Sequence, residues 1–417
     1  MRALACPCNA EALIDAALRF HARASRAGLA LCVLAGALAA GCASERATAP
    51  SAPSPREMHA AHAHEGVDAP APSPPPAAPA GLVLAFGGDV IAHEALRGAA
   101  ARADRRDADG TSLNASGYGA LVGAVEAAVR GVDIAFANLE SPVTPHRRRR
   151  GGMIFQGEEP LLAAIAGAGF HVLSLANNHA FDQGRVGLTD TLSAVERHGL
   201  VAVGAGATMR AACEPRFVER RGIKVAFLAR TLVMNFPEPA DAGKPAVCML
   251  AEGPLKQHVR AARRDGADLV IASLHWGNEY ERAPRRDQIE AAHRIVEAGA
   301  DLVIGHHPHV LQRVERMRAR DGREALIAYS LGNLLSNQAF AFDPSVGREA
   351  DGDTRDAAVL RVAVARGEDG VVRVEEASAI PLWTHHTAEG DILVVPATSR
   401  RARIGKRLEV PLIDVAP

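Results

Sequence analysis

From Gly81 onward, short apolar runs alternate with longer stretches whose apolar residues recur at helical spacing. The apolar runs have the length of strands and contain few polar residues, which is typical of strands that are buried on both faces. They lie at residues 82–86, 133–137, 171–176, 200–203, 224–229, 268–274, 301–304 and 325–331. Helices are expected between them, at residues 119–130, 159–168, 186–198, 253–265 and 287–298. This alternation predicts an α/β fold in which helices cover a largely buried sheet.

The segment from residue 356 to 394 has a different pattern, because its strand-like runs are not separated by helices. We expect these runs to complete the sheet edge or one layer of the same domain. The sequence shows no internal repeat. We therefore assign residues 81–400 to one α/β domain and residues 401–417 to a C-terminal tail.

Residues 1–42 are predicted to form an export signal. The small and apolar run Gly28–Ala40 follows several arginines and is too short for an ordinary membrane-spanning helix. It ends in LAAGC, which resembles the lipobox of bacterial lipoproteins, so Cys42 is the expected lipidation site. The protein is then expected to be exported and lipid-anchored to the bacterial envelope, on its periplasmic or cell-surface face. A signal cleaved nearby without lipidation, or an uncleaved anchor, would explain the same pattern.

Composition adds three constraints. Residues 43–80 are rich in Ala and Pro and are predicted to be a disordered linker. The formal net charge of −1 gives no electrostatic reason to expect a nucleic acid as the partner. Apart from Cys42, only Cys213 and Cys248 would remain after the signal is removed, and an exported protein can join such a pair. Their spacing alone does not decide whether Cys213 and Cys248 form a disulfide.

Polar residues that suit metal binding follow many of the predicted strands. In open α/β sheets, binding sites form where the carboxyl ends of strands meet, so these residues are expected to lie close together. The set comprises Asp89, Asn138, Glu140, Asn177, Asn178, His179, Asp182, His275, His306, His307, His309, Gly332 and Asn333.

Each of these residues also has an ordinary structural explanation when it is taken alone. A Gly-Asp pair after a strand is usually a turn, and a single histidine there is more often a hydrogen-bonding residue. His307 and His309 are stronger evidence, because both rings can reach one cavity from a loop stiffened by Pro308. Taken together, the residues indicate a metal site whose ligands lack thiolate, which suits Mn, Fe or Zn. The candidates outnumber the four ligands of one zinc ion, so two divalent ions are expected.

The chain also resembles a known family. Its motifs GGDV, ANLESPV, LSLANNHAFDQG, SLHWGNEY, GADLVIGHHPHVLQ and YSLGNLLSNQ are similar, in this order, to those of the bacterial capsule-synthesis family (CapA-type, poly-γ-glutamate synthesis). That family belongs to the calcineurin-like metallophosphoesterase superfamily. The resemblance runs from about Leu82 to Leu382 and implies a four-layer α/β/β/α sandwich with a two-metal site at the strand ends.

The resemblance also implies roles for individual residues. The expected metal ligands are Asp89, Asn138, Glu140, Asn178, His275, His307 and His309. Glu140 is the candidate bridging carboxylate, and His179 is expected to act as an acid or to stabilise the transition state. His306 and Asp182 are expected to contact the ligand side chains without binding the metal themselves. Ile91 stands where the wider superfamily has a histidine, a departure that is typical of the capsule-synthesis branch.

Two functions follow as hypotheses. The first is a metal-dependent hydrolase of a phosphoester or a related bond, linked to capsule or poly-γ-glutamate synthesis. The second is a non-catalytic accessory protein that binds, assembles or exports an anionic exopolymer. Either one would work with the polymer synthesis machinery and contact the membrane through its lipid anchor. Tyr280 and Trp276 are candidates for the wall of the cleft, although Trp276 would serve equally well as a packing residue.

Overall fold

The computed structural model of this chain describes residues 81–239, 241 and 243–415. The predicted export signal (1–42), its Cys42 and the predicted linker (43–80) lie outside the described residues. No helix in the described part of the chain is long and apolar enough to cross a membrane.

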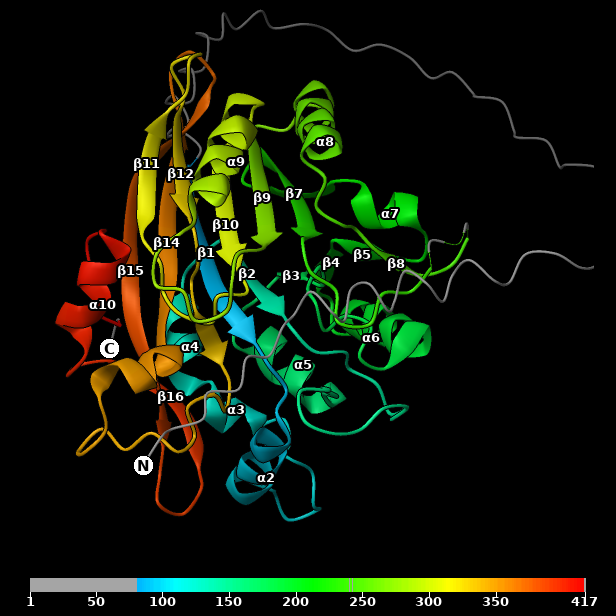
Figure 1. Cartoon of the computed structure of the whole chain (residues 1–417), viewed down its shortest axis with the longest axis vertical. Helices are drawn as coiled ribbons and strands as arrows, with labels where there is room; N and C mark the ends of the chain where they lie inside the picture. The colour runs from blue at the N-terminus through cyan, green and yellow to red at the C-terminus, as the bar shows by residue number, and fades with distance from the viewer. Residues whose placement is uncertain (1–80, 240, 242, 416–417) are drawn as a thin grey trace, which may run out of the picture. The chain divides into compact units, whose positions relative to one another are not determined.

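Two large β-sheets form the centre of the fold (Figure 1). The first has eight strands in the order β16-β15-β14-β1-β2-β3-β4, with β13 paired to β1. Its strands are β1 (Gly81–Val90), β2 (Ile134–Leu139), β3 (Val172–Ser174), β4 (Val201–Val203), β13 (Asn333–Leu335), β14 (Asp356–Arg366), β15 (Val372–His386) and β16 (Ile392–Pro396). The run of strands predicted at residues 356–394 therefore forms one side of this sheet.

The second sheet has six strands in the order β11-β12-β10-β9-β7-β6. They are β6 (Arg216–Arg220), β7 (Ile223–Thr231), β9 (Leu269–His275), β10 (Leu302–His306), β11 (Val314–Arg318) and β12 (Glu324–Ala328). Strands β7, β9, β10 and β12 run parallel, as do β1 to β4 in the first sheet. A small third sheet pairs β5 (Ala205–Gly206) with β8 (Ala246–Val247).

Helices connect the strands and cover the outer faces of the sheets. They are α2 (Glu94–Ala103), α3 (Tyr118–Leu121), α4 (Gly123–Val129), α5 (Glu159–Gly167), α6 (Gly184–Arg197), α7 (Met209–Cys213), α8 (Glu252–Arg264), α9 (Arg286–Glu297), the 3₁₀ helix η1 (Glu349–Arg355) and α10 (Arg401–Leu408). Helices α8 and α9 contact β7, β9 and β10 of the second sheet, whereas α4 and α6 contact strands of the first.

Successive residues of the inner strands face different layers of the fold. In β9, Leu269 and Ile271 belong to the core between the two sheets, while Val270 packs in the core under α8 and α9. Both faces of the strand are thus apolar, as its unbroken apolar sequence predicts. Phe136 of β2 and Phe227 of β7 stack across the inter-sheet core, with ring centroids 5.9 Å apart. The predicted four-layer α/β/β/α sandwich is confirmed.

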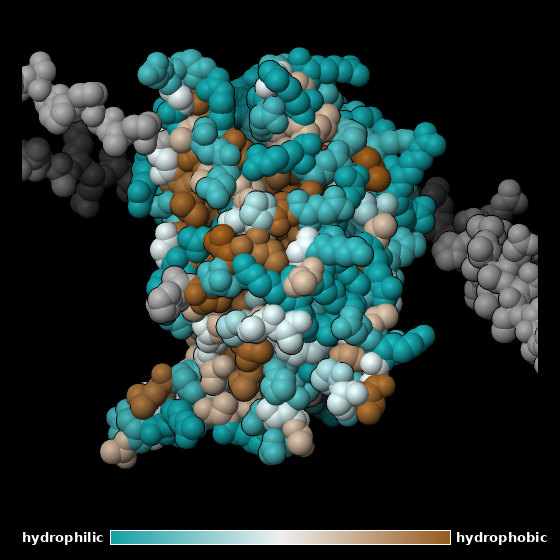
Figure 2. All heavy atoms as spheres, turned by 90° about the vertical axis from the view of Figure 1, so that its left-hand side faces the viewer, coloured by the Kyte–Doolittle hydropathy of each residue, from teal (hydrophilic) through white to brown (hydrophobic). Residues whose placement is uncertain are grey.

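The C-terminal segment differs in form from the tail expected at residues 401–417. Residues 401–408 form α10, whose Ile404 and Leu408 are fully buried against the core. The next segment returns to β15, where Leu412 forms a parallel bridge with Ala379. Figure 2 views the side of the unit that carries α10 and β15, where apolar residues run down the middle between polar surroundings.

Cys213 at the end of α7 and Cys248 after β8 form a disulfide. The bond spans 35 residues of sequence and ties α7 to the small third sheet. A loop of this length is expected to stabilise the fold by about 2–4 kcal/mol, because the bond restricts the unfolded chain.

Gly305 in β10 lies in close contact with the backbone of a neighbouring segment of the second sheet. A β-carbon at this position would lie 1.9 Å from the carbonyl oxygen of Tyr329. Gly305→Ala is therefore expected to lower the free energy of unfolding by at least about 2 kcal/mol, since the backbone of two neighbouring segments must separate. Chemical denaturation measures the change.

Gly167 at the end of α5 is the matched control for this prediction. It has a negative φ, and a β-carbon there would meet nothing within 4 Å. Gly167→Ala is expected to leave the free energy of unfolding unchanged or to raise it by up to about 1 kcal/mol. Equal stability of the two variants would show that the backbone contact at Gly305 is not tight.

Candidate metal centre

The site lies where the carboxyl ends of parallel strands from both sheets meet. Within the first sheet, Asp89 of β1 is directly opposite Asn138 of β2 and Asn333 of β13. Within the second sheet, His306 of β10 is directly opposite His275 of β9. These five residues lie at strand ends that meet at one place, although the strands belong to two sheets.

Asp89 joins the two sheets at this point. Its buried carboxylate accepts a hydrogen bond of 2.9 Å from the amide nitrogen of Asn138 in its own sheet. From the second sheet, the ring of His306 lies 3.1 Å away, and the ring of His309 lies 3.3 Å away. Burial acts to raise the pKa of Asp89, but its hydrogen bonds with His306 and His309 hold that pKa well below the ordinary value. The group is therefore a carboxylate at neutral pH.

Glu140 is the second buried carboxyl group of the site. Burial, and after it the charge of Asp89, raise its pKa well above the ordinary value. Its Oε1 is buried and accepts no hydrogen bond from any described residue. The same atom lies 3.5 Å from Nε2 of His275 and 3.8 Å from Nε2 of His309. The ionised form of Glu140 would therefore need a cation beside Oε1.

Glu140 belongs to two overlapping groups of ligand atoms. One group is Glu140, His307 and His309, and the other is Asp89, Glu140 and His275. In each group the ligand atoms lie within 4.8 Å of one another. Burial lowers the pKa of His275 far below its ordinary value and that of His307 to about 4, so both rings are neutral and offer a lone pair. Imidazole and carboxylate donors of this kind fit a divalent metal ion.

The loop that carries two of these histidines has an uncommon backbone. His307 has a φ of 95° and His309 a φ of 58°, which non-glycine residues rarely adopt. The backbone N–H of His307 donates to Oδ2 of Asp89 over 3.3 Å, and Nδ1 of His309 lies 3.0 Å from Oδ1 of Asn333. Such conformations cost roughly 1–3 kcal/mol each and cluster at functional sites.

Three other predicted residues lie in the cluster with distinct contacts. Nδ2 of Asn138, rather than its oxygen, faces the carboxylates of Asp89 and Glu140. Oδ1 of Asn178 lies 2.8 Å from Nε2 of His275. His306 contacts Asp89 through Nδ1, while its buried Nε2 has no partner among the described residues.

His179 and Asp182 form a buried pair beside the cluster. Nδ1 of His179 lies 2.8 Å from Oδ2 of Asp182, which also accepts a hydrogen bond from the backbone N–H of Phe155. The ring of Phe155 packs on His179 with centroids 4.3 Å apart. This arrangement places a proton on Nδ1 of His179, while Nε2 lies 3.4 Å from Nδ2 of Asn235.

The sequence alone assigns no role to some residues that lie at the site. Asn177 donates to the oxygen of Asn138, and the amide of Asn333 lies against His309, although the sequence shows only that both follow strands. Asn235, which contacts His179 and Asn178, lies in the loop after β7 and has no motif around it. Trp276 is buried against Tyr329, so it packs and does not line the cleft.

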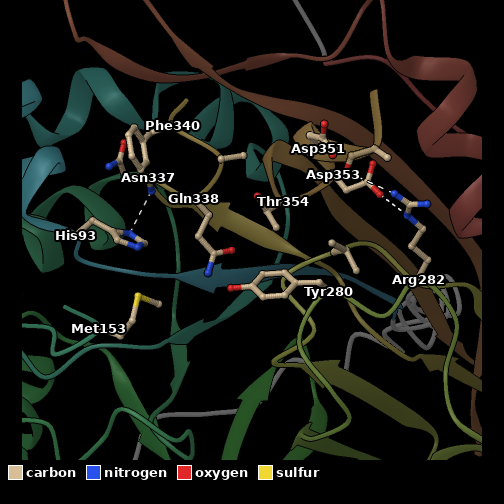
Figure 3. Close-up of a pocket in the computed structure, with 13 residues that line it drawn as sticks. His93, Met153, Tyr280, Arg282, Asn337, Gln338, Phe340, Asp351, Asp353 and Thr354 are labelled. Atoms are coloured by element: carbon tan, nitrogen blue, oxygen red, sulfur yellow. Dashed lines mark hydrogen bonds and ion pairs between the residues drawn. The ribbon is translucent and has the colours of Figure 1, made fainter. Parts of the chain in front are cut away.

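A cavity of about 510 Å³ adjoins the cluster (Figure 3). Tyr280 lines it and lies beside His309, with ring centroids 6.1 Å apart. His93 lines the cavity as well, and its ring contacts that of Phe155. Figure 3 shows His93 and Arg282 at opposite ends of the cavity, with Tyr280 and Gln338 between them.

Comparison with known proteins agrees with the sequence motifs. The model of the family described as bacterial capsule synthesis protein PGA_cap matches residues 83–338. The capsule biosynthesis protein CapA of Bacillus anthracis is 34% identical over 218 residues, which are 50% of this chain and 51% of that protein. The PGA biosynthesis protein CapA of Bacillus subtilis is 30% identical over 267 residues, which are 62% of this chain and 66% of that protein. The chain thus spans about half to two thirds of the length of these relatives.

A search of solved structures finds the NAD nucleotidase (NadN) of Haemophilus influenzae. It is 12% identical, with a TM-score of 0.42, over 81% of this chain and 65% of that chain. Because both values are low, the fold described above rests on the strands and helices of this chain itself.

The shared position of Glu140 gives a prediction about metal content. Glu140→Gln is expected to leave less metal in the purified protein than either His275→Ala or His307→Ala, because Glu140 belongs to both groups of ligand atoms. Inductively coupled plasma mass spectrometry measures the metal, and a thermal melt checks that each variant is folded.

His293→Ala is the control, since His293 pairs with Glu315 on the outer face of the second sheet and is half-exposed. It is expected to retain the full metal content. If Glu140→Gln retains as much metal as this control, Glu140 does not bind the ion.

Proposed function

The chain belongs to the bacterial capsule synthesis protein family, and we propose that it is a metal-dependent hydrolase acting in the synthesis of a capsule or of poly-γ-glutamate. The bond that it cleaves is a phosphoester or a chemically related bond. One observation carries the proposal, which is that Glu140 is shared by two groups of buried histidines and carboxylates. A donor set of this form suits two divalent ions of the Mn, Fe or Zn type.

Two divalent ions held by Asp89, Glu140, His275, His307 and His309 would supply Lewis acidity, which lowers the pKa of water and stabilises charge on a phosphoryl oxygen. The protein itself holds these donors in fixed positions and shields them from bulk solvent. Both carboxylates are fully buried, and Asn138 binds the two of them through one amide nitrogen.

His179 is the residue placed to handle a proton. Asp182 accepts the hydrogen bond of Nδ1–H, so Nε2 is the nitrogen that exchanges a proton with the substrate, and it donates to the departing oxygen when the ring carries both protons. Phe155 packs against this ring at a tilt and restricts its rotation. Asn235 lies 3.4 Å from the ring and keeps a polar environment on that side. Asp182 thus acts through His179 by setting its tautomer and orientation.

The adjoining cavity would hold the rest of the substrate. Its volume of about 510 Å³ is in the usual range of ligand sites. Burial lowers the pKa of His93 to about 4, so this ring is a neutral polar group at one end of the cavity. Tyr280 and Gln338 supply further hydrogen-bonding groups nearer the cluster.

We also propose that the protein is exported and held at the bacterial envelope by a lipid on Cys42. The sequence LAAGC at the end of the apolar run carries this proposal. The disulfide between Cys213 and Cys248 supports it, because such bonds persist in oxidising compartments.

The activity is tested with the full chain loaded with Mn²⁺ or Zn²⁺ and a nitrophenyl phosphate mono- or diester. His179→Ala is expected to lower kcat by about 10²-fold or more while the metal content stays that of the unmodified protein, because this residue handles a proton and does not bind the ion. Asp182→Asn is expected to lower kcat less. His293→Ala serves again as the unaffected control.

An unmodified protein that binds metal but hydrolyses no ester would overturn the hydrolase proposal. That outcome favours the second hypothesis from the sequence, a non-catalytic accessory protein that binds an anionic exopolymer.

The anchor is tested separately by Cys42→Ala in the full chain expressed in a bacterial host. The variant is expected to move from the membrane fraction to the soluble fraction and to lose labelling by a radioactive fatty acid. If both proteins stay in the membrane fraction and neither is labelled, the apolar segment acts as an uncleaved anchor, and Cys42 carries no lipid.

A further inference from the structure

His93 lines the cavity beside the metal centre, and one of its ring nitrogens is unused by the protein. The side chain is half-buried and its ring points into the cavity (Figure 3). Nδ1 is occupied, because the backbone N–H of Asn337 donates to it over 3.1 Å. Nε2, at the end of the ring that is farther from the backbone, has no hydrogen-bond partner within residues 81–239, 241 and 243–415. This nitrogen is available to a ligand.

The contact with Asn337 fixes the tautomer of His93. A backbone N–H directed at Nδ1 excludes a proton on that atom, so the proton of the neutral ring is on Nε2. The carbonyl oxygen of Ile91 also lies 3.3 Å from Nδ1, but it already accepts the backbone N–H of His93 over 2.8 Å. Burial lowers the pKa of His93 to about 4, so the ring is neutral at neutral pH. Nε2 is thus a hydrogen-bond donor of the cavity.

Phe155 places this donor close to the reacting groups. Its ring packs edge-on against His93, with centroids 4.9 Å apart. The same ring packs against His179, with centroids 4.3 Å apart. The free donor and the residue that exchanges a proton with the substrate therefore contact one aromatic side chain. A substrate that reacts beside His179 can reach His93 with a group of moderate size.

The charged side chains that line this cavity are already paired within the protein. Arg282 pairs with the buried Asp353, and Asp351 pairs with Arg348 over 2.8 Å. A charged group of a ligand would lose water in the cavity without meeting an unpaired counter-charge, which is unfavourable. The cavity therefore suits an uncharged part of the substrate.

Apolar side chains form much of the remaining wall. Phe340 and Met153 line the cavity, although they are 73% and 51% exposed. Exposed apolar side chains of this size gain when a ligand covers them. Val310, which follows His309 in the chain, is buried and also lines the cavity. A group with an apolar body and one oxygen that accepts a hydrogen bond matches these surroundings.

We propose that His93 is a specificity-determining residue, whose Nε2–H donates a hydrogen bond to an uncharged oxygen in the alcohol portion of the substrate. The inference rests on the proposed function, because that function places the rest of the substrate in this cavity. The alcohol belongs to an uncharged and largely apolar class, with its body against Phe340 and Met153.

The test measures the binding of phosphonates to the full chain loaded with Mn²⁺ or Zn²⁺, by isothermal titration calorimetry. Phenylphosphonate has no acceptor beyond its phosphonate group. The 3- and 4-acetyl derivatives add an uncharged acceptor at one of two positions, and 4-carboxyphenylphosphonate adds a charged one. The better acetyl compound is expected to bind about three- to ten-fold more tightly than phenylphosphonate, as one neutral hydrogen bond predicts. The carboxy compound is expected to bind no better than phenylphosphonate.

Two variants separate ligand binding from the contact with Asn337. His93→Asn keeps an acceptor for the backbone N–H of Asn337 but has no donor at the position of Nε2, whereas His93→Gln offers an amide N–H there. His93→Asn is expected to lose the preference for the acetyl compound, and His93→Gln to retain part of it. Both are expected to bind phenylphosphonate as the unmodified protein does, which shows that they are folded. His293→Ala is the control and keeps the full preference.

The outcomes separate this inference from the hydrolase proposal. A preference for the acetyl compound that His93→Asn abolishes supports the inference even if the protein hydrolyses no ester, because the measurement needs no turnover. Equal affinities for phenylphosphonate and both acetyl compounds, or a preference that survives in His93→Asn, overturn it. Tightest binding of the carboxy compound overturns the assignment of an uncharged alcohol. If no phosphonate binds, the metal centre does not hold the reacting group, and the inference fails with it.

Discussion

The hydrogen bonds of Asp89 hold the two sheets together at the site, and the geometry of every other donor depends on them. This carboxylate lies at the end of a strand in the first sheet, while the ring of His306 and the backbone of His307 reach it from the second. A buried charge without partners costs several kcal/mol, so the sheets are stable at this edge only in the relative position that supplies those partners. The distances between Glu140 and the histidines follow from that position.

The charges of the cluster favour a bound cation. Asp89 is held as a carboxylate by its histidine partners, and Glu140 beside it is disfavoured as a second negative charge. His275 and His307 are neutral because burial opposes their protonation. His275 and His307 therefore supply no positive charge to Glu140, and a divalent ion would stabilise its ionised form.

The sequence predicts the strands and the composition of the site well, because both follow from strong local patterns. Runs such as residues 268–274 are apolar on both faces, and the polar residues after them stand out against that background. It does not predict which sheet each strand joins, since the runs in both sheets look alike. Edge strands β6 and β11 are missed because each has a single buried residue, which leaves too little apolar signal.

Residues that reach the site from loops could not be predicted from the sequence either. Asn235 reaches His179 only because the chain turns back after β7, and no local pattern encodes that turn. Similarly, α10 has only Ile404 and Leu408 as buried residues among basic ones, so its contribution to the core becomes evident only in three dimensions. The convergence of Arg282 with this helix on Asp353 has the same origin.

The shared place of Glu140 has a consequence for how the proposed ions are loaded. Because Glu140 belongs to both groups of ligand atoms, an ion bound at one position would change the electrostatics and the orientation of this carboxylate for the other. The two affinities would then be linked by a coupling free energy, and each ion would alter the binding of the other by the same factor. The metal content of the protein would then not follow a one-site saturation curve as the metal concentration rises.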